Sequence, residues 1–243
     1  MKAVCLAAAL LCLAALSYGL GPTFFHKRLD PRVLRRLSDD RAVMLTFDDG
    51  PDPRYTGLLL DLLRRERVKA TFFVVLSRAD RHPEIIGRML REGHSLALHG
   101  YEHKSALWRS PRALRADFAR SQEVLQRRQW QVDYCRPPWG HFNLCSMAAL
   151  RGLGLRPVTW SVMAQDWKRD TTGRAIYYKL LRRVAPGSII CLHDAGGAQN
   201  APLRTLEALR EALPALKMRG LHFVTADDLM QGDAYAEQTQ KLA

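Results

Sequence analysis

The stretch AVMLTFDDGPDP, residues 42–53, joins a short apolar run to an abrupt polar end. Its first six residues are apolar or β-branched, which is typical of a strand buried on both faces of a parallel sheet. Asp48 and Asp49 follow at once, and Gly50 and Pro51 then favour a turn. Asp-Gly-Pro is common in ordinary turns, but two adjacent carboxylates repel each other. Their place beside a buried strand therefore indicates a positive charge nearby.

Similar apolar runs recur along the chain and alternate with amphipathic stretches of helical period. This strand-then-helix order predicts an α/β fold with a parallel sheet covered by helices. The pattern fits a closed barrel and an open doubly wound sheet equally well. Expected strands cover 42–47, 70–75, 94–99, 132–137, 156–162, 188–193 and 221–226. Expected helices cover 56–68, 82–93, 110–128, 143–154, 172–185 and 202–220.

The composition favours one domain in anionic surroundings. The chain has 243 residues, of which 47% are hydrophobic, so it can bury one large core. Its formal net charge of +13 favours a membrane face, an acidic wall polymer or nucleic acid as surroundings. Arginines are spread through the expected helices and no nucleic-acid motif is present, so we expect no nucleic-acid partner.

The first 25 residues contain a single charge, that of Lys2, and are interpreted as a signal peptide or an N-terminal membrane anchor. Residues 26–41 are polar and basic, which indicates a linker or a first helix. One domain over 42–232 and a polar tail over 233–243 complete the chain. We expect a secreted or membrane-anchored protein that faces the cell exterior. Basic residues follow the apolar run, so an anchor with an inward-facing domain is the alternative.

Polar residues stand where the expected strands end. In parallel α/β folds the carboxyl ends of all strands meet at one edge of the sheet, where active sites are built. Residues distant in sequence should therefore converge there. The residues in question are Asp48, Asp49, His99, His103, Arg136, Trp139, Asp166, Trp167, His193 and Asp194.

Asp49, His99 and His103 have the chemistry of a catalytic metal site. The histidines are four residues apart, so one helix-like turn of backbone would direct both at one ion. Two nitrogens and one oxygen, with positions left open, suit Zn²⁺, with Co²⁺ or another divalent ion as alternatives. An isolated H-x-x-x-H is more often a solvated turn, but its pairing with DDGP favours the metal site. Asp48 would then stay free to move a proton.

The cysteines outside the N-terminal segment do not form a disulfide framework. Cys135 and Cys145 are interpreted either as a pair or as free thiols. Cys191 lies in an expected strand with no evident base beside it, so we expect it in the core.

The order TFDDGP, HGYEH, RPPWG, QDW and LHD resembles the NodB-homology polysaccharide deacetylases of carbohydrate esterase family 4. The resemblance runs from about residue 42 to 229. It implies a distorted (β/α) barrel of seven parallel strands. It also implies metal-dependent removal of N-acetyl groups from a glycan that contains N-acetylglucosamine, such as peptidoglycan or a chitin-like oligomer.

The resemblance also implies roles for single residues. Asp48 matches the catalytic base and His193 the general acid, while the metal ligands match Asp49, His99 and His103. Arg136 matches the arginine that orients the base. Trp139 stands where the family has an aromatic residue, usually Tyr, whose backbone helps to hold the oxyanion. Asp166 and Trp167, in the QDW motif, are expected to contact substrate or transition state.

Two positions depart from the family pattern. Met163 stands where the fourth motif, D-x-x-D-W, has its first carboxylate, and Cys191 stands where a leucine of the acetyl pocket is common. Met163 carries no charge with which to tune His193, so we expect Asp166 or Asp194 to do so.

Two other functions compete with the deacetylase hypothesis. A chain that kept the metal and groove but lost turnover would be a carbohydrate-binding or wall-attached module. A chain with the same chemistry and a smaller substrate would be an amidase of a small C–N compound. The acid–base residues Asp48 and His193 argue against the first, and the expected export signal at the N-terminus argues against the second.

Overall fold

One parallel sheet organises the chain in the computed structural model, which describes residues 1–231. The expected tail at 233–243 lies outside the described residues. The strands run in the spatial order β5-β4-β3-β2-β1-β7-β6, and β8 pairs with the first half of β1. They are β1 (Ala42–Asp48), β2 (Thr71–Val74), β3 (Ser95–Leu98), β4 (Tyr134–Cys135), β5 (Arg156–Pro157), β6 (Val162–Met163), β7 (Ile189–His193) and β8 (His222–Val224).

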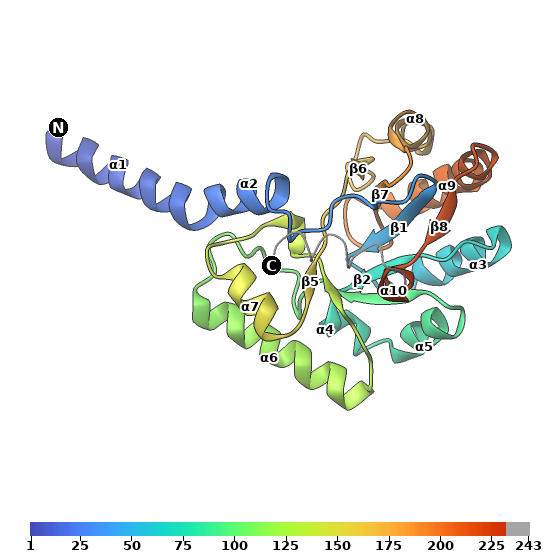
Figure 1. The fold of residues 1–243 in the computed structure, drawn as a ribbon, viewed down its shortest axis with the longest axis horizontal. Coiled ribbons are helices and arrows are strands. Elements are labelled where there is room, and N and C mark those ends of the chain that lie inside the picture. Colours follow the sequence, from blue (N-terminus) through green and yellow to red (C-terminus); the bar gives the residue numbers. More distant parts are fainter. Residues whose placement is uncertain (232–243) are drawn as a thin grey trace.

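The seven strands of this path curl into a half-barrel with helices around its outside (Figure 1). The expected α/β class, the parallel sheet and the seven-stranded distorted barrel are confirmed. The helices outside the N-terminal segment are α3 (Thr56–Glu66), α4 (Leu76–Ala79), α5 (Pro83–Arg91), α6 (Pro111–Arg128), α7 (Ser146–Gly152), α8 (Gly173–Arg183), α9 (Ala201–Met218) and α10 (Ala226–Gln231).

Local sequence signals set the starts of these helices. Ser110 caps α6 by accepting a hydrogen bond from the Ala113 amide at 3.2 Å, and Pro111 follows in the first turn. Thr172 caps α8 in the same way, through the Ala175 amide at 3.1 Å. The helices therefore begin where side-chain acceptors replace the missing backbone partners.

The expected single strand at 156–162 is wrong, because it divides into β5 and β6 at opposite ends of the path. Between them the chain crosses from one sheet edge to the other. The Val158 amide still bonds β4, but the Thr159 amide donates to Leu34 and the Ser161 amide to Ile189 of β7. The backbone groups of this stretch are thus shared among three partners, and no single strand can form.

Residues 26–41, expected as a linker, take part in the sheet. Val33 and Leu34 are buried, and Leu34 forms a parallel bridge with Val158. Arg36 forms an antiparallel bridge with Ser188. This short extended segment lies between the two open edges of the half-barrel.

The N-terminal segment is helical and projects away from the sheet (Figure 1). It comprises α1 (Lys2–Ala15), a π-helical turn (Leu16–Leu20) and α2 (Gly21–Arg28). Its final turns contact the domain, where Tyr18 donates to the Arg109 carbonyl at 2.6 Å and Thr23 to the Phe142 carbonyl at 2.5 Å. Within residues 1–231, none of the helices has the length and apolar character needed to span a membrane.

Alternation along β1 and β7 decides which side chains enter the barrel. Val43, Leu45 and Phe47 of β1 belong to the larger core cluster, while Met44 belongs to the smaller one on the opposite face. Successive strand residues point to opposite faces, so Thr46 and Asp48 share the face of Met44. In β7, by the same count, Cys191 and His193 share the face of Ile189.

Candidate metal and acid–base site

A cavity of about 540 Å³ opens at the carboxyl ends of the strands. Seven of the ten polar residues expected to converge at this edge line it, whereas Arg136, Asp166 and Asp194 are buried and do not. The seven are Asp48, Asp49, His99, His103, Trp139, Trp167 and His193.

Asp49, His99 and His103 form a three-ligand cluster. Their ligand atoms all lie within 4.8 Å of one another. The Asp49 Oδ1 atom is 3.0 Å from His103 Nε2 and 3.4 Å from His99 Nε2. This Oδ1 atom is buried and lacks a hydrogen-bond partner among the described residues, as a ligand oxygen would. The donor set and the unpaired oxygen fit a divalent cation.

The chain holds each ligand of this cluster in place. His99 Nδ1 donates to the Arg136 carbonyl at 2.6 Å, which leaves the His99 Nε2 lone pair facing Asp49. Asp49 has a φ of 76°, and its carbonyl accepts a hydrogen bond from Arg78 Nη1 at 2.6 Å.

The expected helix-like turn at HGYEH is wrong, because His103 reaches the site from a loop. Gly100 has a φ of +87°, which turns the chain away from β3. The Tyr101 amide then donates to Asp117 Oδ2 at 3.0 Å, which fixes the loop against α6.

The cluster favours the ionised form of Asp49. Burial alone would raise the pKa of Asp49, but the adjacent His103 and His99 rings, whose Nε2 atoms lie 3.0 and 3.4 Å from its Oδ1 atom, hold the pKa well below its usual value. Asp49 is therefore a carboxylate, which is the form that ligates metals.

Asp48 lies beside the cluster and is held by Arg136. Arg136 Nη1 donates to Asp48 Oδ1 at 2.5 Å and to Thr46 Oγ1 at 2.8 Å. Arg136 Nη2 donates to the Thr159 carbonyl at 3.1 Å, and the guanidinium lies 4.0 Å from the centre of the Phe73 ring. Arg136 is fully buried, so it compensates the charge of Asp48 and orients it without lining the cavity.

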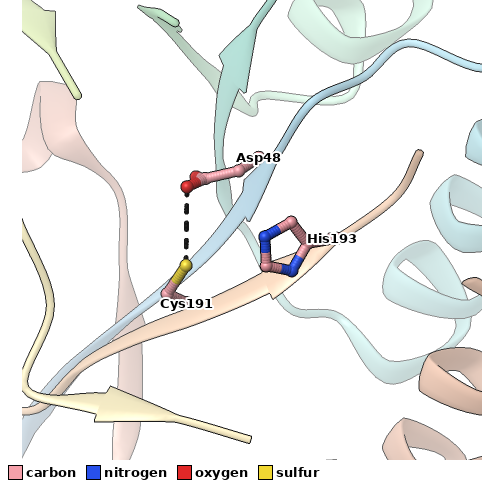
Figure 2. Close-up of side chains that lie close together, drawn as sticks. All are labelled: Asp48, Cys191 and His193. Atoms are coloured by element: carbon pink, nitrogen blue, oxygen red, sulfur yellow. Dashed lines mark hydrogen bonds between the residues drawn. The ribbon is translucent and has the colours of Figure 1, made fainter. Parts of the chain in front are cut away.

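The second oxygen of Asp48 meets Cys191. The Cys191 thiol, from β7, donates to Asp48 Oδ2, at the end of β1, at 3.4 Å (Figure 2). Burial and the Asp48 charge raise the pKa of Cys191 well above its usual value, so the group is a thiol. Cys191 is buried as expected, but it also lines the cavity. Cys191 lies two residues before His193 in the same strand, so the two side chains share one face of the sheet. This spacing was the sequence signal that Cys191 would reach the cavity.

His193 is bound to Asp166. Asp166 Oδ1 is 3.0 Å from His193 Nδ1, and Asp166 Oδ2 accepts hydrogen bonds from the His193 amide at 2.8 Å and from Thr205 Oγ1 at 3.0 Å. Burial alone would lower the pKa of His193, but the charge and hydrogen bond of Asp166, with Asp48 and Asp49, raise it to about 9. At neutral pH His193 is protonated, as a general acid must be.

Of the two carboxylates considered as partners of His193, the structure selects Asp166. Asp194 points instead to Thr56, whose hydroxyl donates to Asp194 Oδ2 at 2.6 Å. Burial raises the pKa of Asp194 to about 7 despite this bond. Asp166 was also expected to contact substrate, but it is buried behind His193 and acts through it.

Two tryptophans form walls of the cavity. The Trp139 ring lies 4.2 Å from the His103 ring, centre to centre, and half of Trp139 is exposed. The Trp167 ring packs edge-on against His193 at 5.1 Å. Exposed aromatic faces beside a polar centre suit a sugar ring.

Sequence reasoning missed several residues that shape the site. Lys27 and Arg78 line the cavity from segments with no motif. Gly196, with a φ of +70°, lies so close to Asp49 that a Cβ would come within 2.9 Å of the Asp49 Oδ2 atom. A glycine pair one residue after LHD was the available signal for Gly196 and Gly197, whereas Lys27 had no such signal. Cys135 and Cys145, left open between a pair and free thiols, are free in the structure.

Comparison with known sequences adds a family match. The sequence model described as polysaccharide deacetylase matches residues 35–158. A peptidoglycan-N-acetylglucosamine deacetylase of Bacillus cereus is 32% identical over 196 residues, which cover 80% of this chain and 90% of the relative. A chitooligosaccharide deacetylase of Rhizobium leguminosarum bv. trifolii is 36% identical over 193 residues, covering 75% and 89%.

Solved structures agree with the sequence relatives. The crystal structure of the Bc1960 peptidoglycan N-acetylglucosamine deacetylase is similar with a TM-score of 0.77 and 28% identity, covering 88% of this chain and 98% of the other. A family 4 acetyl xylan esterase from Clostridium thermocellum, solved with a cobalt ion, has a TM-score of 0.70 and 34% identity, covering 79% and 91%.

Proposed function

The chain belongs to the polysaccharide deacetylase family, and from this premise we propose that it hydrolyses the acetamido group of N-acetylglucosamine units in peptidoglycan or a chitin-like oligomer. One observation carries the proposal. The candidate metal cluster, Asp48 and His193 line a single cavity, so a base, an acid and a cation would meet around one acetamido group.

Asp49, His99 and His103 would hold a divalent cation, which we propose to be Zn²⁺. A cation held there would polarise the acetyl carbonyl and favour attack by water. Zn²⁺ fits two imidazoles and a carboxylate with positions left open for substrate, and Co²⁺ accepts the same ligands.

The chain itself moves the protons. Asp48, oriented by Arg136, accepts the proton of the attacking water. His193 donates its proton to the amine nitrogen as the C–N bond breaks, so that acetate and a free amine are the products. The Trp139 backbone, at the mouth of the cavity, would help to hold the developing oxyanion.

The form of the cavity favours a glycan over a small C–N compound. The cavity is open to solvent and has Trp139 and Trp167 in its lining. A polymer can pass through such a cleft, whereas small-molecule sites bury most of their ligand. Arg136 forms an ion pair with the base Asp48, and Asp166 forms one with the acid His193. A protein that only binds a glycan needs neither pair, so the two ion pairs favour catalytic turnover.

The test measures acetate release and metal content together. Purified protein loaded with Zn²⁺ or Co²⁺ should release acetate from chitooligosaccharides or peptidoglycan. Asp49→Ala should lose both the metal and the activity. Asp52→Ala, a carboxylate three residues away that binds Arg54 instead, should keep both. Absence of acetate from every N-acetylated glycan in the panel, with metal bound, would refute the proposal.

We further propose that the protein is exported and faces the cell exterior, where such glycans lie. Apolar side chains of α1, among them Leu6, Leu10 and Leu13, are exposed to solvent. An apolar surface of this kind supports an export signal or an attachment to a membrane.

A further inference from the structure

A second cavity, of about 590 Å³, adjoins the first one. The two cavities share Lys27, Trp160 and Met163 in their linings, so a chain-like ligand can pass from one into the other. The second cavity is formed by the segment from Lys27 to Arg36, by β6 and by the end of α8. Neither the sequence motifs nor the acid–base chemistry gives it a role.

The lining of this second cavity is cationic. It contains five basic residues and no carboxylate. Within the described part of the chain, none of the five takes part in an ion pair, although Arg32 of the same segment pairs with Asp30 at 2.8 Å. The five are Lys27, Arg28, Arg35, Arg36 and Arg183.

Main-chain carbonyls hold three of these guanidinium groups without neutralising them. Arg35 donates to the Asp30 carbonyl at 2.8 Å, Arg36 to the Pro186 carbonyl at 2.9 Å and Arg183 to the Met163 carbonyl at 3.2 Å. Like charges gathered in one concavity repel each other and attract an anion. Their remaining N–H groups suit a planar carboxylate.

Lys27 and Trp160 stand at the junction of the two cavities. Lys27 Nζ donates to the Trp139 carbonyl at 3.1 Å and lies 4.3 Å from the centre of the Trp160 ring. Partial burial lowers the pKa of Lys27. A sugar that follows the acetylated one would therefore cross an aromatic face beside an ammonium group.

We propose that this basic cavity binds the carboxylate of a neighbouring sugar in the same glycan, so that the enzyme favours acidic glycans over neutral ones. The inference rests on the proposed function, since it needs an acetylated sugar in the first cavity. A neutral polymer would leave five cations uncompensated, whereas an acidic one neutralises part of that charge.

The test uses two substrates that differ only in charge. A peptide-free tetrasaccharide of alternating N-acetylglucosamine and N-acetylmuramic acid carries lactyl carboxylates, and its methyl ester carries none. Wild type is compared with Arg28→Gln/Arg36→Gln and with a matched control, Arg112→Gln/Arg115→Gln. The control removes the same two charges from exposed positions on α6, outside both cavities.

Wild type should hydrolyse the acid about tenfold better than the ester in kcat/KM, a difference of about 1.4 kcal/mol. Most of the preference should lie in KM, and it should shrink as NaCl is raised. The double variant in the basic cavity should bring the ratio of the two kcat/KM values close to one. The control variant should keep the wild-type ratio.

Equal rates for the two substrates in wild type, or an unchanged preference in the Arg28/Arg36 variant, would overturn the inference. Binding to anionic phospholipid vesicles is measured by sedimentation for the same variant. If the variant no longer sediments with the vesicles but still prefers the acid to the ester, the arginines bind a membrane surface instead. If neither these two substrates nor the chitooligosaccharides release acetate, the proposed function fails. Calorimetric binding of the acid and the ester to the same variants then decides the inference separately.

Discussion

At the level of single residues, His193 depends on Asp166 for its protonated state. The motif MAQDW has Met163 in place of a carboxylate, yet Asp166 Oδ1 still lies 3.0 Å from His193 Nδ1. The pair raises the pKa of His193 to about 9 in a position where burial alone would lower it. His193 therefore needs no carboxylate at position 163, because Asp166, the second carboxylate position of the motif, holds it.

The change Asp166→Asn should lower kcat/KM at alkaline pH. In wild type the acid form of His193 exists below about pH 9, so kcat/KM should fall only above that pH. Without the Asp166 charge, the pKa of His193 should fall to its ordinary 6.5 or below. At pH 8 about one molecule in 30 would then be protonated, and kcat/KM should drop about 30-fold.

The control for this experiment is Asp194→Asn, which changes a buried carboxylate that bonds Thr56 and not His193. In this variant the decline of kcat/KM at alkaline pH should begin at the same pH as in wild type. At about pH 5–6, where His193 regains its proton in the Asp166→Asn enzyme, the activity of that enzyme should recover relative to wild type. An alkaline limb still near pH 9 after the Asp166→Asn change would contradict the assignment.

At the level of elements, the segment from Val33 to Arg36 joins the two open edges of the half-barrel. Leu34 pairs with Val158 beyond β5, and Arg36 pairs with Ser188 ahead of β7. The same segment carries the arginines of the basic cavity. One stretch of chain therefore contributes both to the closure of the sheet and to the surface beside the site.

Leu34→Ala should lower the free energy of unfolding by about 2–5 kcal/mol, as removal of a buried leucine side chain does. Leu34 is only 5% exposed and belongs to the smaller core cluster, the one that contains Met44. Leu29→Ala is the matched control, since Leu29 is 59% exposed and its replacement should change stability by no more than about 0.5 kcal/mol. Urea denaturation followed by circular dichroism measures both. Equal midpoints for the two variants would show that the segment is not part of the folded unit.

At the level of the whole molecule, the charge and the N-terminal helix are the features that support the proposed location outside the cell. The net charge of +13 favours contact with anionic polymers, and α1 projects from the domain with apolar side chains exposed (Figure 1). The basic cavity lies where α2 and the following segment meet the domain, so it would remain if the chain were cleaved near residue 25.

Export can be tested by deleting residues 1–25. The full chain should be recovered from the medium or from the outer face of the membrane, where added protease reaches it. The deletion variant should stay inside the cell and, because Lys27 and the site residues are retained, should still hydrolyse the glycan when purified. N-terminal sequencing of the exported protein distinguishes a cleaved signal from a retained anchor. Full-length protein confined to the cell interior would refute the localisation.

The sequence by itself determined the strand–helix order, the class of the sheet and the polar residues at the carboxyl ends of the strands. These follow from periodicity and from local chemistry, which act over a few residues. Asp48, Asp49, His99, His103 and His193 could be expected together because the carboxyl ends of parallel strands meet at one edge. The resemblance to a family then chose the barrel over the open sheet.

Tertiary structure alone decided the contacts that tune this site. The division of 156–162 depends on Leu34, which lies more than 120 residues earlier in the chain. The choice of Asp166 over Asp194 depends on Thr56, and the place of Lys27 depends on Trp160. Such contacts join segments whose spacing in sequence carries no signal, because packing and charge compensation act between neighbours in space.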